Sequence, residues 1–155
     1  MAGKIDAHLA ELGIEIPAAT APAANYVPYV KTGNLVFISG QVPFVDGKLT
    51  YQGKVGKDFK TEDGVACARI CALNILSQVK DACGGDLDRV VRCVKLSGFV
   101  NCIDGFGEQP TVINGASDLM VEVFGDKVRH ARFAVGTNAL PMNVAVEIDA
   151  VFEIN

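Results

Sequence analysis

The chain has 155 residues, of which 50% are hydrophobic and 21% charged, and its formal net charge is -4. This length fits one domain that buries roughly 68–70% of the surface its unfolded form would expose. The acidic balance, without a Lys/Arg cluster, argues against sequence-nonspecific nucleic-acid binding. So apolar a composition in a small domain suggests that another subunit covers part of its surface.

The N-terminal residues and the cysteines indicate the cellular compartment that we expect for the protein. The N-terminal residues lack the continuous apolar stretch of a secretory signal, and no apolar run is long enough to span a membrane. Five cysteines, none in a CxxC motif, occur with only two histidines, which argues against a zinc site. Cys67 and Cys71 share one helix face and are expected in the core. We therefore expect a reducing, cytoplasmic location and no membrane partner.

The first half of the chain predicts a short helix and two turns. A helix over 5–12 ends at Gly13, and a loop rich in Pro and Ala follows. Gly33-Asn34 separates strands over 29–31 and 35–38, which predicts a hairpin. Asp46-Gly47 predicts a second turn, with a short strand after it.

The second half alternates long helices with strands. A helix is predicted over 61–82, with Thr61 as N-cap and Gly84-Gly85 after its end. A strand over 90–100, a helix over 110–124 and strands over 131–137 and 144–154 complete the chain. This order predicts an α+β fold with two long helices on one face of a single mixed sheet. We expect an N-terminal helix and extension over 1–20 and the main domain over 21–155.

Charged residues interrupt the two apolar closing strands. In 144–154 the alternate residues beginning at Val144 form an apolar face, and Glu147 and Asp149 point the other way. In 131–137 we expect Phe133 to face the core and Arg132 to lie opposite. Ala134 and Gly136 leave space beside that arginine.

An antiparallel hairpin of these two strands could place Arg132 opposite Glu147, which would hold the guanidinium in one orientation. The ordinary alternative is a solvated cross-strand ion pair with little effect on stability. His8 and His130 lack flanking catalytic partners and are expected to be structural. Asn114, by itself, reads as a surface polar residue on the second long helix.

Three segments resemble the RidA/YjgF family, also called endoribonuclease L-PSP. "ARFAVGTNALPMNVAVEIDA" is similar to the C-terminal signature of the family, through Ala131-Arg132, Leu140-Pro141 and Val146 to Asp149. "APAANYVPYVKTGNLVFISGQVP" is similar to its N-terminal segment, and Val112-Ile113-Asn114 is a weaker match. Together these matches run from about Ala21 to the C-terminus, and the departures from the pattern described below make the chain resemble a divergent subgroup.

The resemblance implies a chorismate-mutase-like fold and a homotrimer with inward-facing sheets and three clefts between subunits. In the family the signature arginine binds the carboxylate of a 2-imino or 2-enamino acid, which water hydrolyses to a 2-keto acid and ammonia. The corresponding residues are Arg132 as carboxylate anchor, Glu147 to position the water, and Tyr29, Ser39, Gly40 and Asn114 around the substrate. No metal or organic cofactor is implied.

Two positions depart from the family pattern. Ala134 stands where many members have a cysteine, and Ser117 where a tyrosine often follows the helical asparagine. These departures leave a second hypothesis open, a trimeric protein that binds carboxylate metabolites without turning them over. The ribonuclease activity in the family label is a remote third hypothesis, since the sequence shows no local His pair or Lys-His set for phosphodiester cleavage.

Overall fold

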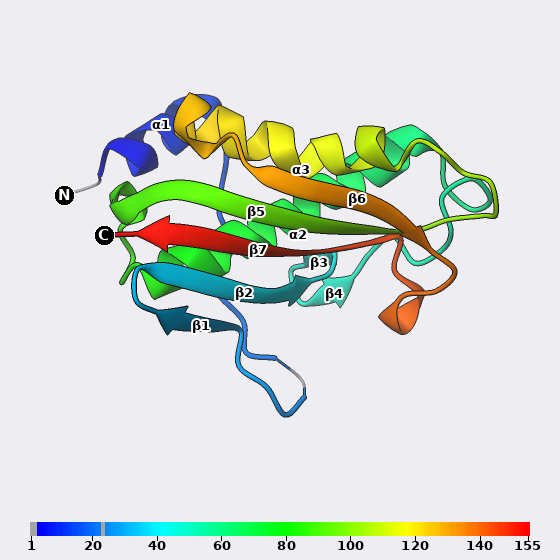
Figure 1. Cartoon of the computed structure of the whole chain (residues 1–155), viewed down its shortest axis with the longest axis horizontal. Coiled ribbons are helices and arrows are strands. Elements are labelled where there is room, and N and C mark those ends of the chain that lie inside the picture. The colour runs from blue at the N-terminus through cyan, green and yellow to red at the C-terminus, as the bar shows by residue number, and fades with distance from the viewer. Residues whose placement is uncertain (1–2, 23) are drawn as a thin grey trace.

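The computed structural model describes residues 3–22 and 24–155 and centres on a five-stranded mixed sheet. Figure 1 shows the strand order β1-β2-β7-β5-β6, with β1 at one edge and β6 at the other. Only β5 and β6 are parallel, and the other neighbours are antiparallel. The strands are β1 (Tyr29–Thr32), β2 (Leu35–Gln41), β5 (Val90–Asn101), β6 (Ala131–Thr137) and β7 (Val146–Ile154).

Two long helices, α2 (Thr61–Ala82) and α3 (Gln109–Phe124), cover one face of this sheet. The core between them is apolar and holds the fully buried Phe152 and Ile148 of β7 with Ile75 and Leu76 of α2. Cys67 and Cys71 lie in the same core with no exposed surface, which confirms their predicted position. The predicted α+β class with helices on one face is confirmed.

Short elements complete the chain. The Asp46-Gly47 turn, with both residues at positive φ, joins β3 (Phe44–Val45) to β4 (Lys48–Leu49) as predicted. Three single-turn helices are η1 (Leu87–Arg89), η2 (Asp126–Val128) and η3 (Pro141–Asn143). In the part of the chain that the structure describes, no helix is both long and apolar enough to cross a membrane.

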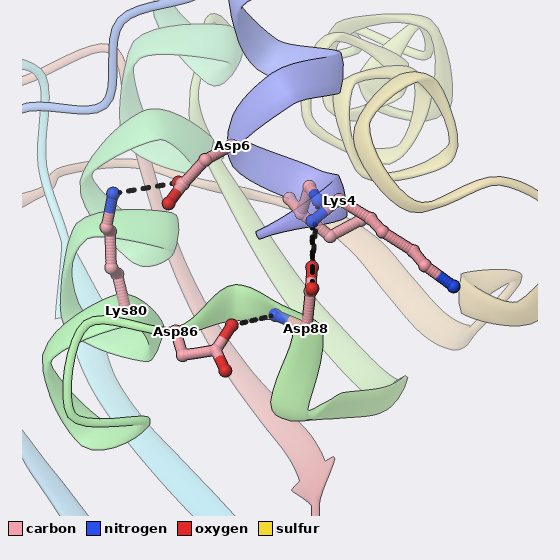
Figure 2. A network of polar contacts seen from close by, with 6 residues as sticks. Lys4, Asp6, Lys80, Asp86 and Asp88 are labelled. Atoms are coloured by element: carbon pink, nitrogen blue, oxygen red, sulfur yellow. Dashed lines mark hydrogen bonds and ion pairs between the residues drawn. The ribbon is translucent and has the colours of Figure 1, made fainter. Parts of the chain in front are cut away.

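The N-terminal helix α1 (Lys4–Leu12) is fixed to the body through its first turn. The carboxylate of Asp88 accepts the backbone N–H groups of Lys4 and Ile5, each at 2.8 Å, and so satisfies donors that a helix start leaves free. Figure 2 shows this contact beside the ion pair between Lys80 of α2 and Asp6, at 3.0 Å. The two backbone hydrogen bonds from Ile5 and Lys4 lower the pKa of the Asp88 carboxyl.

The predicted hairpin between the last two strands is wrong. β5 lies between β6 and β7, so Arg132 stands beside Leu96 in the register and Glu147 beside Phe99. The physical reason is the helical connection from β5 to β6, because such a crossover brings two strands side by side in parallel.

The predicted orientation of β6 is also wrong. Arg132 faces α3, since both of its side-chain hydrogen bonds go to that helix, whereas Phe133 faces away and packs edge to face on Phe99. Apolar side chains therefore occupy the sheet face without helices. Three of them, Val30, Phe37 and Val135, are 53%, 45% and 41% exposed.

The start of α2 differs from the prediction as well. The sequence predicts Thr61 as its N-cap, but Lys60 takes that position and its backbone N–H donates to the Asp63 carboxylate at 2.9 Å. Thr61 is the first helical residue, and its hydroxyl donates to Glu108 at 3.0 Å. A carboxylate at the third helical position can thus satisfy the first turn without a capping hydroxyl.

Candidate functional site

Arg132 lies in the groove between β6 and α3. Its Nη1 donates to the Ser117 hydroxyl at 3.0 Å and its Nη2 to the Pro110 carbonyl at 3.2 Å. Ser117 and Pro110 are two helical turns apart, so the guanidinium is held along the side of α3. Among the described residues, no Asp or Glu forms an ion pair with it. The side chain is partly exposed and its charge lacks a counter-ion.

The small residues on the same strand face as this arginine do not leave the predicted open space, because neighbouring side chains pack closely against them. Ala134 follows it, and then Gly136, where an added Cβ would lie 2.8 Å from the Cys102 sulfur. A cleft of about 300 Å³ opens at the C-terminal end of β6, and its polar lining residues are Asp104, Gln109, Thr137 and Asn138. Gln109, one of the residues that line the cleft, precedes Pro110 in α3, and Gly136 lies four residues beyond Arg132 on β6, so the cleft lies farther along the strand than the guanidinium.

Ser117 and His130 form a hydrogen-bonded pair behind Arg132. The Ser117 hydroxyl lies 2.8 Å from His130 Nε2, and His130 Nδ1 lies 2.8 Å from the Val128 carbonyl. Because a carbonyl only accepts, Nδ1 carries the proton in the neutral ring and Nε2 accepts the hydroxyl proton of Ser117. Burial, and then the charge of Arg132, lower the pKa of His130. The ring is therefore neutral at pH 7.

A second group of predicted site residues lies on the opposite face of the sheet. Glu147 on β7 is half-buried, and an added Cβ at Gly40 would fall 2.5 Å from its Oε1. Gly40 therefore allows the carboxylate to lie against β2. Burial first, and the nearby Asp149 second, raise the pKa of Glu147. Ser39, next to Gly40, donates its hydroxyl to the Val27 carbonyl at 2.7 Å.

The other two predicted site residues, Tyr29 and Asn114, form no hydrogen bond with Arg132 or Glu147 in the described part of the chain. The Tyr29 hydroxyl donates to Asp81 near the end of α2 at 2.8 Å, and this bond raises the pKa of Tyr29 more than its burial does. Asn114 is exposed on α3, one turn before Ser117 and one turn after Pro110. Its position on the helix puts it on the side that carries the contacts of Arg132.

The two groups do not meet within one copy of the chain. Arg132 and Glu147 point to opposite sheet faces, and their strands are separated by β5. Two strand spacings and a three-residue offset in register place their Cα atoms about 14 Å apart. Glu147 therefore does not orient Arg132. That contact is made by Ser117 and Pro110 instead.

The contribution of Ser117 and His130 is not visible in the sequence. His130 precedes β6, and Ser117 lies thirteen residues earlier on α3, so no local spacing joins them. A usable signal was the β5-α3-β6 order. A parallel crossover packs its helix against the strands it connects, which brings the helix face near the start of β6.

The fold and this site together define a class of α+β protein. Helices cover one face of its sheet, and an arginine at the sheet edge forms no ion pair with a carboxylate of the described residues. A family model described as "YjgF/chorismate_mutase-like, putative endoribonuclease" matches residues 6–153. The chain belongs to this family, also known as YjgF/RidA.

Relatives match over nearly the whole chain. Protein TCP17 of Trypanosoma cruzi is 51% identical over 99% of this chain and 96% of its own length. The crystal structure of Atu1372 from Agrobacterium tumefaciens, a protein of unknown function, is 48% identical with a TM-score of 0.90, over 97% and 92% of the two chains. A crystal structure from Shewanella oneidensis, described as "a putative endoribonuclease", is 35% identical with a TM-score of 0.93, over 98% of this chain and 100% of that one.

Proposed function

We propose that this protein binds small 2-imino and 2-keto acids through Arg132, in clefts formed between copies of the chain. The observation that carries the proposal is the state of the guanidinium: two of its N–H groups are held by α3, and no carboxylate of the described residues forms an ion pair with it. A planar fork with free donors fits the two oxygens of a ligand carboxylate. A cleft with polar groups lies farther along β6, at Gly136 to Asn138, and Gln109 at the start of α3 lines it.

The clefts are proposed to be shared because one copy cannot complete them. Arg132 and Glu147 lie on opposite faces and are too far apart for a three- or four-carbon acid to touch both. The exposed apolar Phe37 and Val135 on the open sheet face support burial against other copies. A homotrimer, as the family resemblance implies, would bring the Arg132 groove of one copy near Glu147 of the next.

A hydrolytic step follows from the properties of Glu147. Its raised pKa makes this carboxylate a stronger base than an ordinary glutamate, and Gly40 leaves space beside it. In the proposed reaction water adds to C2 of the imine while Glu147 takes one water proton. With the imine nitrogen protonated at the start, this gives a neutral carbinolamine. Glu147 returns its proton to the amino group, the C–N bond breaks to release ammonia, and the hydroxyl group loses its proton to solvent as the C2=O bond of the 2-keto acid forms.

Mixed assemblies test the shared cleft and the reaction together. Arg132→Gln and Glu147→Gln chains should each be inactive in hydrolysing 2-imino acids that an amino-acid oxidase supplies. Co-assembled chains should regain activity, because a cleft can then take Arg132 from one copy and Glu147 from another. If both variants are inactive and the mixture is too, the cleft is not shared in this way. Wild-type rates equal to buffer would exclude the hydrolase.

A non-catalytic carboxylate-binding protein is the second candidate. The observation in its favour is Ala134, because none of the five cysteines lies at that position beside Arg132. Such a protein would bind 2-keto acids yet leave 2-imino acids unchanged. The net charge of -4 gives little support to ribonuclease activity. Five free, buried cysteines support a cytoplasmic location as part of the proposal.

A further inference from the structure

Three side chains form a chain of hydrogen bonds that ends at the guanidinium of Arg132. The His130 ring is fixed by the Val128 carbonyl, Ser117 lies between the ring and the arginine, and Arg132 donates to Ser117. In the family pattern a tyrosine often stands at the position of Ser117. The hydrogen bonds through the Ser117 hydroxyl therefore depend on a residue in which this chain departs from that pattern.

We propose that Ser117 and His130 are positioning residues for Arg132, and that capture of a carboxylate by Arg132 is coupled to uptake of a proton at His130. The inference rests on the proposed function, since it concerns the same anchor. It adds a pH dependence and two residues that act on the ligand only through Arg132.

The positioning role follows from the direction of each proton. The neutral His130 ring donates through Nδ1 and accepts through Nε2, so the Ser117 proton points at the ring. The lone pairs of the Ser117 oxygen are then left for Nη1 of Arg132. Together with the Pro110 carbonyl, this holds the guanidinium plane before any ligand arrives, which reduces the entropy lost on binding.

The proton uptake follows from charge. The positive Arg132 is one of the causes that lower the pKa of His130. A carboxylate bound to Arg132 offsets that charge, so the pKa of His130 rises in the complex. By linkage, binding becomes tighter as pH falls through the range in which the free protein's ring is neutral and the bound protein's ring takes up a proton. A protonated ring can still donate to Ser117, whose oxygen accepts from both neighbours.

Other charged groups near the ring do not supply this coupling. Of the charged groups within residues 3–22 and 24–155, Arg132 is the one among the causes that shift the pKa of His130. Asp126 and Arg129 pair with each other, and Lys127 donates to the Val90 carbonyl. Lys95 of β5 lies over the Phe133 ring, on the sheet face away from α3, and Asp118 of α3 is exposed.

The experiment is a calorimetric titration of the whole protein with pyruvate between about pH 5 and 8, in buffers of low and high ionisation enthalpy. His130→Gln offers a carbonyl to Ser117 but cannot titrate. Ser117→Ala removes the link, and Ser117→Thr retains a hydroxyl. His8→Gln is the matched control, because His8 is the other histidine of the chain and its ring bonds to the Glu122 carbonyl and not to Ser117 or Arg132.

Wild type and His8→Gln should take up a proton on binding and bind more tightly at lower pH. These histidine variants are compared in a Glu147→Gln background, which removes the other titratable group that the proposed cleft brings near the ligand. In that background His130→Gln should bind without proton uptake and with a flat pH profile. Ser117→Ala should weaken binding about 2- to 10-fold, and Ser117→Thr should restore it. Proton uptake that survives in His130→Gln in that background, or unchanged affinity in Ser117→Ala, would overturn the inference while leaving the carboxylate site intact. Absence of pyruvate binding in wild type would instead remove the proposed function, and this inference with it.

Discussion

Gly98 lets α3 pack against the centre of the sheet, and its replacement by alanine tests that arrangement. An added Cβ at Gly98 would lie 2.6, 2.6 and 2.9 Å from three side-chain carbons of Ile113, which is fully buried on α3. Carbon atoms normally approach to about 3.5–4.0 Å, so the overlap is about 1 Å. Because Ile113 is fully buried on α3, relief of the overlap requires its side chain or α3 to shift away from the sheet.

The magnitude follows from two opposing effects. Overpacking of this kind costs about 1–3 kcal/mol. Loss of a glycine from the unfolded chain returns about 0.4–1 kcal/mol. Gly98→Ala should therefore lower the free energy of unfolding by about 1–2 kcal/mol and the Tm by about 2–8 °C. Because α3 carries Ser117 and the Pro110 carbonyl, the shift should also loosen Arg132 and weaken ligand binding.

Urea denaturation of single and double variants measures this effect. Ile113→Ala removes the three carbons and alone should cost about 2–5 kcal/mol, but with Gly98→Ala the total should be less than the sum. Gly40→Ala is the control, because its methyl meets the end of Glu147, which can rotate. Additive costs at Gly98 and Ile113, or a larger loss for Gly40→Ala than for Gly98→Ala, would refute the packing described here.

Three further predictions concern titratable groups. The pKa of Glu147 is raised in the folded protein, so its negative charge destabilises the fold above that pKa. Glu147→Gln should therefore increase the free energy of unfolding at neutral pH. Urea denaturation should show that this free energy falls less in the variant than in wild type as pH rises from about 4.3. Asp88→Asn should speed hydrogen exchange in α1 but not in α2, since its lowered pKa reflects the bonds to Lys4 and Ile5, and acid below that pKa should act likewise in wild type. Burial raises the pKa of Cys93 to about 12, so a thiol reagent at pH 7 should modify it only after urea unfolds the protein; equal rates with and without urea would contradict this.

Local patterns were sufficient to predict the elements of the fold. The helix over 61–82 has the same bounds in the structure, because its apolar period is long and Gly84-Gly85 ends it. The Asp46-Gly47 turn and the helix ending at Gly13 depend on backbone conformations that favour those residues. Such signals involve neighbours in the sequence and need no knowledge of the partner elements.

The pairing of the last strands could not be predicted from the same patterns. The short connection from 138 to 145 suggested a hairpin, but β5 inserts between β6 and β7. Phe133 was expected in the core because it is apolar, whereas the helix side of β6 holds Arg132, Ala134 and Gly136. The start of α3 lies close to this strand, so small residues fit there, and the apolar ones occupy the open face.

The predicted family is confirmed, whereas the predicted roles of the site residues remain predictions. Arg132 and Glu147 were identified from the resemblance, but the hydrogen bonds that orient Arg132 come from Ser117 and Pro110. A serine on a helix and a histidine thirteen residues later carry no joint signal in one sequence. Their contact depends on how α3 packs against β6, which only the three-dimensional structure shows.

The affinity of the protein for pyruvate, compared between wild type and Arg132→Gln, tests the central claim most directly. Arg132→Lys serves as a second variant, since it retains the charge but lacks the planar fork. We predict that Arg132→Gln weakens binding about 10- to 100-fold, as expected when a hydrogen-bonded ion pair is lost, and that Arg132→Lys recovers part of the affinity. Equal affinity of wild type and Arg132→Gln would show that the carboxylate is bound elsewhere and would contradict the account.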